Sequence, residues 1–159
     1  MKKKTIIISF LGIFLALFLV KALLNVQPKE IANAPDWQTV EAAEKQALDQ
    51  NKLIFVDVYE VGCKYCRAME REVFPDSTVR QVLDAGYIPV KINGKSEELI
   101  TFNGRSVPQV EWAKEYGVYA FPSALIIDTE GNLIKKNTGF MGVDDLRRFL
   151  YLNKEKTSL

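Results

Sequence analysis

The sequence contains no histidine, and it has only two cysteines among its 159 residues. Without histidine, the chain has no Ser-His or Cys-His catalytic pair and no His ligand for a metal. A zinc or copper site would need carboxylates or a second chain to complete the two cysteines. The 21 Lys and Arg residues are balanced by 20 Asp and Glu residues, so no strong positive field favours nucleic acid. We therefore expect neither a bound metal nor a nucleic-acid partner.

The two cysteines, Cys63 and Cys66, lie three residues apart between an apolar run and a helical stretch. Residues 53–59 are apolar, β-branched and aromatic, which predicts a buried strand. Residues 67–74 contain mostly good helix formers and no Gly or Pro, so Cys63 should lie at the N-terminus of a helix. The positive end of the helix dipole favours a thiolate there. This spacing beside a βαβ pattern is typical of a redox-active dithiol.

Two other roles for the cysteine pair stay open. A static disulfide would close a very short loop, and the stabilisation from loop closure is smallest for short loops. Half of a metal site would lack its remaining ligands. We favour redox chemistry, in which the disulfide between Cys63 and Cys66 serves the reaction and no separate cofactor is needed.

The N-terminal segment combines a basic start, Lys2-Lys3-Lys4, with a long apolar run over residues 6–20. Such a pattern is typical of a secretory signal peptide or a signal anchor. From Thr5 to Val26 the segment is about long enough to span a bilayer, provided that Lys21 extends to the membrane surface. The lysines hold the N-terminus in the cytoplasm. We therefore predict a single-pass anchor over residues 1–26 in the cytoplasmic membrane, with the rest of the chain outside, where disulfides are permitted.

Cleavage of this segment would instead release a soluble domain, secreted or periplasmic. Residues 32–34, Ala-Asn-Ala, resemble a cleavage site. Pro35 would follow the cut, and we expect it to hinder cleavage. We favour the uncleaved anchor, followed by a linker over residues 27–36.

Residues 37–159 form the predicted domain, in which helical and strand patterns alternate. The expected strands are 53–59, 87–92, 123–128 and 132–137, and the expected helices are 37–51, 67–74, 76–86, 108–116 and 144–153. Pro89 argues for an edge position of the second strand, and residues 93–107 are expected to form a loop with one helical turn. A βαβ unit followed by a hairpin and a closing helix predicts an α/β fold. It would have a mixed sheet of about four strands with helices on both faces.

Five short motifs carry a resemblance to a known family. They are Val56-Asp57-Val58-Tyr59, Cys63-Lys64-Tyr65-Cys66, Tyr116-Gly117-Val118, Phe121-Pro122-Ser123 and Gly139-Phe140. Residues 37–152 resemble the thioredoxin family through these motifs. More narrowly, they are similar to its extracytoplasmic branch, which includes the C-terminal domain of the transmembrane electron carrier DsbD and periplasmic thioredoxins of sulfur-compound oxidation.

The resemblance implies where substrates bind. It implies a cis peptide bond before Pro122, in a loop that faces the cysteines. Phe121 and Pro122, together with Lys64 and Tyr65 between the cysteines, are the expected substrate-binding residues. Gly62 stands where the family usually has Trp before the first cysteine, which makes the surface beside the thiol less aromatic.

Asp57 is an acidic residue in an otherwise apolar strand, and a buried acid requires either a partner or a function. The resemblance places it behind Cys66, as a catalytic residue with Cys63 and Cys66. The alternative is a structural acid with a paired cation. Lys91 matches the position of a lysine that pairs with this acid in thioredoxins, whereas its own sequence context fits an exposed lysine on a strand equally well.

The predicted function is thiol-disulfide exchange outside the cytoplasm, reducing the disulfides of exported proteins. A reductase there needs an electron donor in the membrane, since the compartment holds no reducing pool. A disulfide oxidase or isomerase on the same fold is one alternative. A thioredoxin-fold module that binds a partner without catalysis is another.

Overall fold

The computed structural model describes residues 2–24 and 31–151. The chain divides into two compact units, Met1–Glu30 and Ile31–Leu159. The first unit contains helix α1 (Lys2–Leu24). Among the described residues, no helix combines the length and the hydropathy that crossing a membrane requires. The end of the expected anchor, residues 25–26, and residues 27–30 of the expected linker lie outside the described residues.

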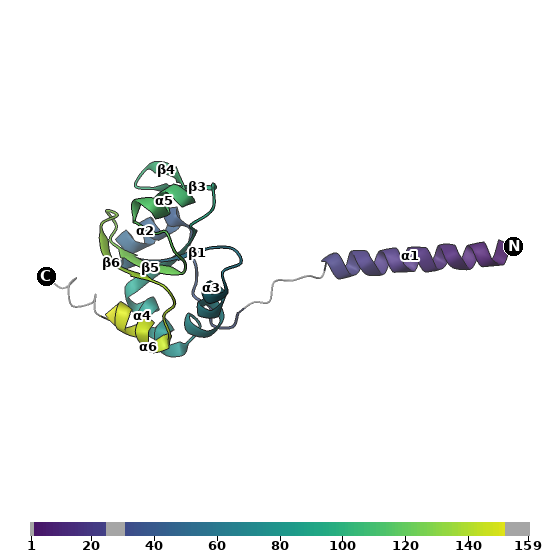
Figure 1. The fold of residues 1–159 in the computed structure, drawn as a ribbon, viewed down its shortest axis with the longest axis horizontal. Coiled ribbons are helices and arrows are strands. Elements are labelled where there is room, and N and C mark those ends of the chain that lie inside the picture. The colour runs from purple at the N-terminus through teal and green to yellow at the C-terminus, as the bar shows by residue number, and fades with distance from the viewer. Residues whose placement is uncertain (1, 25–30, 152–159) are drawn as a thin grey trace. The chain divides into compact units, whose positions relative to one another are not determined.

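The second unit is built on a four-stranded sheet in the order β2-β1-β5-β6 (Figure 1). The strands are β1 (Leu53–Tyr59), β2 (Tyr87–Asn93), β5 (Ser123–Ile127) and β6 (Leu133–Thr138). β1 runs parallel to β2 and antiparallel to β5, and β5 and β6 form an antiparallel hairpin. The mixed sheet confirms the prediction, and β2 lies at an edge, as Pro89 indicated.

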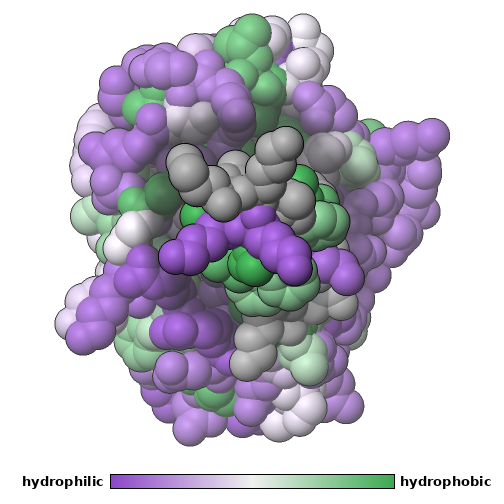
Figure 2. Space-filling view, turned by 90° about the vertical axis from the view of Figure 1, so that its right-hand side faces the viewer, coloured by the Kyte–Doolittle hydropathy of each residue, from purple (hydrophilic) through white to green (hydrophobic). Residues whose placement is uncertain are grey.

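Helices cover both faces of this sheet (Figure 1). α2 (Val40–Gln50) and α5 (Gln109–Glu115) pack on one face, and α4 (Ser77–Gly86) and α6 (Val143–Tyr151) pack on the other. On the side of the molecule that Figure 2 shows, most of the surface of this unit is hydrophilic. The buried apolar residues form two layers, one between each face of the sheet and its helices.

Alternate side chains of β1 enter these two layers. Ile54, Val56 and Val58 belong to the layer beneath α2 and α5, whereas Phe55 belongs to the layer beneath α4 and α6. Because successive side chains of a strand point to opposite faces, Asp57 lies on the same side as Phe55.

Residues 93–107 contain a β-hairpin, so the prediction of a loop was wrong. β3 (Leu99–Phe102) pairs with β4 (Arg105–Pro108) across Asn103 and Gly104. These two turn residues have φ angles of 50° and 71°, as a two-residue turn with the twist of a hairpin requires.

The hairpin is attached to α2 through two carboxylates. The backbone N–H groups of Thr101 and Asn103 donate to Glu41 Oε1 at 2.8 Å and to Glu44 Oε1 at 2.6 Å. Glu41 and Glu44 lie three residues apart and so on the same side of the helix. One helix face therefore holds the outer edge of β3.

The compact domain begins before the expected helix. Asn33 Nδ2 donates to the carbonyl oxygen of Pro75 at 2.5 Å. Arg80 Nη1 donates to the carbonyl oxygen of Asn33 at 2.9 Å and also to that of Ala34. Residues 31–36, which we expected in the linker, thus belong to the second unit.

Tyr87→Phe should lower the free energy of unfolding by about 1–2 kcal/mol. The Tyr87 hydroxyl donates to the carbonyl oxygen of Leu150 at 2.6 Å in a buried contact that ties β2 to α6. Phe would leave this oxygen without its buried donor. Urea unfolding of both proteins measures the difference. Tyr151→Phe, at a position that is 48% exposed, is the control, and an equal loss in the two variants would contradict the prediction.

Candidate active site

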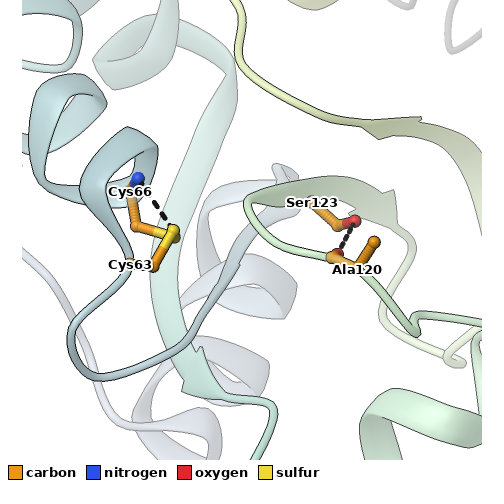
Figure 3. The surroundings of a disulfide bond; sticks show 4 residues. All are labelled: Cys63, Cys66, Ala120 and Ser123. Atoms are coloured by element: carbon orange, nitrogen blue, oxygen red, sulfur yellow. Dashed lines mark hydrogen bonds between the residues drawn. A yellow bond between two sulfur atoms is a disulfide. The ribbon is translucent and has the colours of Figure 1, made fainter.

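The two cysteines form a disulfide bond, with 5.3 Å between their Cα atoms. Cys63 caps the N-terminus of α3 (Lys64–Ala68), and its Sγ accepts a hydrogen bond from the backbone N–H of Cys66 at 3.1 Å (Figure 3). Cys63 is half-buried, whereas Cys66 is only 6% exposed. Cys63 is therefore the sulfur that a substrate can reach, and the N–H group beside it is a donor for its thiolate.

Gly62 occupies the turn that leads into α3. Its φ of 87° lies in the left-handed region, which side chains with a Cβ rarely adopt. The backbone N–H of Cys63 closes this turn on the carbonyl oxygen of Glu60 at 3.2 Å. The turn thus gives a conformational reason for glycine in place of the aromatic residue that is usual in the family.

We had expected a continuous α-helix over residues 67–74, but the α-helix that Cys63 caps ends at Ala68. After α3 the backbone forms a π-helix, η1 (Met69–Val73). Met69 and Val73 are buried in the layer that contains Phe55. η1 therefore packs on the side of the sheet that Asp57 faces.

The loop before β5 lies across from the disulfide (Figure 3). The peptide bond between Phe121 and Pro122 is cis, as the resemblance implies. Ser123 Oγ donates to the carbonyl oxygen of Ala120 at 2.8 Å and lies 3.2 Å from Thr138 Oγ1. Sequence reasoning missed this hydroxyl, which closes the loop around Pro122.

Asp57 lies in register with Lys91 on β2 and with Ala124 on β5. It is 3% exposed. Burial raises the pKa of Asp57 to about 7, the nearby Lys91 ammonium lowers it, and the Glu70 carboxylate raises it. A carboxyl with this pKa exchanges a proton near neutral pH, as a general base must.

Lys91 forms its ion pair with Glu70, with 2.6 Å between Nζ and Oε1. Its ammonium also lies 4.8 Å from the centre of the Tyr59 ring and 5.4 Å from that of Trp37. We had considered Asp57 as the partner of Lys91. Lys91 lies beside Asp57 in register and attracts its charge, but its hydrogen bond goes to Glu70. The pairing of Lys91 with Glu70 was missed, although Glu70 is four residues after Cys66 and so on the same side of the helix.

Lys64 and Tyr65, the residues between the cysteines, are exposed. Tyr65 is 58% exposed and Phe140 is 47% exposed. Their ring centres lie 6.1 Å apart. The surface beside the disulfide therefore has an aromatic pair, Tyr65 and Phe140, although Gly62 replaces the usual Trp. Within the described part of the chain, no group of three or more Cys, Asp or Glu residues is arranged to hold a metal ion.

Comparison with known proteins agrees with this geometry. The family model of the thioredoxin-like domain matches residues 40–152. The thiol:disulfide interchange protein DsbD of Yersinia pestis is 31% identical over 130 residues, which cover 80% of this chain and 18% of that protein. The chain thus spans about a fifth of the length of the curated relatives that it matches.

Two solved structures extend the comparison. The solution structure of a Bacteroides thetaiotaomicron protein, provisionally assigned as a disulphide-isomerase, is 26% identical with a TM-score of 0.61, covering 78% of this chain and 96% of the other. The reduced C-terminal domain of Neisseria meningitidis DsbD is 21% identical with a TM-score of 0.54, covering 71% and 92%, and shows a shared fold. The protein belongs to the thioredoxin-like family. It has the fold and the cysteine pair of a thiol-disulfide oxidoreductase.

Asp57→Asn should stabilise the protein at about pH 8 and much less at about pH 4. The pKa of Asp57 is about 7 in the fold, against an ordinary value of 3.8. Between these values the unfolded chain releases a proton that the folded chain keeps, so the stability of the wild type falls as pH rises. Above pH 7 the free energy of unfolding of the wild type is lower by on the order of 4 kcal/mol. The neutral Asn does not ionise, so the variant does not lose this stability.

Denaturant unfolding of the oxidised proteins at the two pH values measures this difference. Asp49→Asn, at an exposed position on α2, is the control for the loss of one acidic side chain. The assignment of a raised pKa to Asp57 fails if Asp57→Asn changes the free energy of unfolding equally at both pH values.

Proposed function

We propose that the chain reduces disulfides of exported proteins by dithiol–disulfide exchange. One observation carries this proposal: a half-buried Cys63 is bonded to a buried Cys66, and the loop of Pro122 lies across from them. In this arrangement one sulfur meets the substrate while the other is shielded from it. The oxidised pair is the product that such a reductase leaves after each turnover.

The reaction starts from the reduced pair. The thiolate of Cys63 attacks one sulfur of the substrate disulfide, forms a mixed disulfide and expels the other substrate sulfur as a thiolate. Cys66 then loses its proton and attacks Cys63, which expels the second substrate sulfur. The substrate gains two electrons, and the Cys63–Cys66 disulfide forms again. A membrane electron donor returns the pair to its reduced state.

Asp57 supports the second step in this proposal. The thiolate is the attacking form, so the buried Cys66 thiol must give up its proton before it can attack. Asp57 is a buried carboxyl with a pKa of about 7, and it faces the side of the sheet on which η1 packs, directly after α3. It can accept the proton directly or through a water, an effect typically worth about 10²–10⁴-fold in rate.

We propose that this chemistry takes place outside the cytoplasm, with α1 as the attachment to the cytoplasmic membrane. Three lysines precede the apolar run, which favours a cytoplasmic N-terminus. The exposed side chains of α1 are large and apolar on several sides of the helix, as Ile7, Ile8 and Ile13 illustrate. Such a surface favours an apolar medium, and a disulfide favours an oxidising compartment.

Oxidation or isomerisation of disulfides is the second candidate. Lys64 and Arg67, on α3 just after Cys63, favour its thiolate, and a stabilised thiolate makes the pair a stronger oxidant. The Bacteroides protein assigned as a disulphide-isomerase supports the same candidate. Trapping of free thiols in intact cells separates the directions, because a reductase is held mainly reduced and an oxidase mainly oxidised.

Cys66→Ala should accumulate mixed disulfides with client proteins, and Cys63→Ala should not. Without Cys66, the intermediate formed by Cys63 cannot be resolved from within the site. Non-reducing gels, with and without dithiothreitol, display the adducts, and mass spectrometry identifies the clients. Equal trapping by both variants, or trapping by Cys63→Ala alone, would refute the assigned roles.

Protease added to spheroplasts should degrade the domain that follows α1 while the membrane stays intact. The predicted orientation leaves only the first residues in the cytoplasm. Immunoblotting of the domain gives the result, and a cytoplasmic protein that stays protected shows that the membrane is closed. Full protection of the domain would overturn the proposed location.

A further inference from the structure

Gly94, directly after β2, lies against the ring of Phe121. A Cβ atom added to Gly94 would lie 2.3 Å from Phe121 Cε1 and 2.7 Å from Cζ. It would also lie 3.1 Å from Val58 Cγ1. The ring of the residue before Pro122 therefore occupies the space that any side chain at position 94 would need.

The backbone gives no other reason for glycine at this position. Gly62 and Gly104 have φ angles of 87° and 71°, which favour glycine, but the φ of Gly94 lies outside the left-handed region. Its φ therefore does not by itself call for glycine. The close approach of Phe121 is what excludes alanine.

We propose that Gly94 is a positioning residue of the substrate-binding loop: its bare backbone sets where the Phe121 ring, and with it Pro122, stands opposite Cys63. This inference rests on the proposed function, because it assigns Gly94 to the recognition of protein disulfides. Gly94 itself touches no reacting atom and acts through Phe121.

The other neighbours of Gly94 are held in place more firmly than the Phe121 ring. The backbone N–H of Gly94 donates to the carbonyl oxygen of Tyr59 at 2.9 Å, and Val58 is fully buried, so neither can retreat easily. Ordinary contact begins at about 3.4 Å, so an added methyl group displaces the ring by roughly 1 Å (3.4 − 2.3 Å). The half-buried ring, over which Lys95 Nζ lies 5.7 Å from the centre, is therefore the group that must move.

Gly94→Ala should raise KM for a protein disulfide and leave kcat nearly unchanged. A misplacement of about 1 Å can cost as much as about 10²-fold, so we expect kcat/KM for insulin, with dithiothreitol as electron source, to fall at least about ten-fold. The rate with a small aromatic disulfide should stay near that of the wild type, because a small substrate reaches Cys63 without docking on the loop. Gly142→Ala is the matched control: its φ is also ordinary, and its added Cβ would meet only Asp145 Oδ2, at 3.9 Å.

A double-mutant cycle with Phe121→Ala tests the route of the effect. Phe121→Ala removes the ring that the methyl group would displace, so Gly94→Ala should cause little further loss in that background. The inference is overturned if Gly94→Ala lowers kcat/KM equally in both backgrounds, if it affects both substrates alike, or if insulin reduction is unchanged.

Nuclear magnetic resonance separates this inference from the proposed function. The wild type should show Overhauser contacts between the Gly94 Hα protons and the Phe121 ring. In Gly94→Ala the amide resonances of residues 120–123 should shift, and in Gly142→Ala they should not. An unmoved loop defeats the inference even if insulin is reduced. A wild type that reduces no protein disulfide, with the loop shifted as expected, defeats the proposed function instead.

Discussion

The ladder of backbone hydrogen bonds that joins β1 to both of its neighbours is the interaction on which the rest of the structure depends. It sets Asp57 opposite Lys91 on one side and Ala124 on the other. The same strand ends at Tyr59, just before the turn into Cys63. Because side chains alternate along a strand, a slip of one residue would turn Asp57 to the opposite face and remove it from the cysteine helix. The pairing of these three strands thus determines on which face of the sheet Asp57 lies.

Burial and the charge of Lys91 shift the pKa of Asp57 in opposite directions, and the resulting pKa is close to neutrality. Removal from water favours the neutral carboxyl, while the Lys91 ammonium favours the carboxylate. Lys91 is itself engaged by Glu70 and lies over two aromatic rings. Its attraction for Asp57 is therefore shared, so the acid keeps a pKa near neutrality.

The parts of the molecule that the sequence predicted are those with local signals. Each of these signals can be recognised from a few neighbouring residues. They are the apolar run of β1, the two residues between the cysteines, and Pro89 at a sheet edge. The hairpin β3–β4 also had a local signal, Asn103-Gly104, but its strands are only four residues long and of mixed polarity, which hid the alternation. The contacts of Lys91 with Glu70 and of Gly94 with Phe121 join distant segments. No periodicity in the chain encodes such pairs.

The attachment of β3 to α2 also bears on the tendency of the protein to aggregate. An exposed strand edge is a template on which another chain can add a strand and begin aggregation. Here the outward N–H groups of Thr101 and Asn103 are already bonded to Glu41 and Glu44. Hydrogen bonds from its own backbone N–H and from that of Thr101 lower the pKa of Glu41. This carboxylate therefore stays charged into mildly acidic conditions, and these two N–H groups stay unavailable for pairing with another chain.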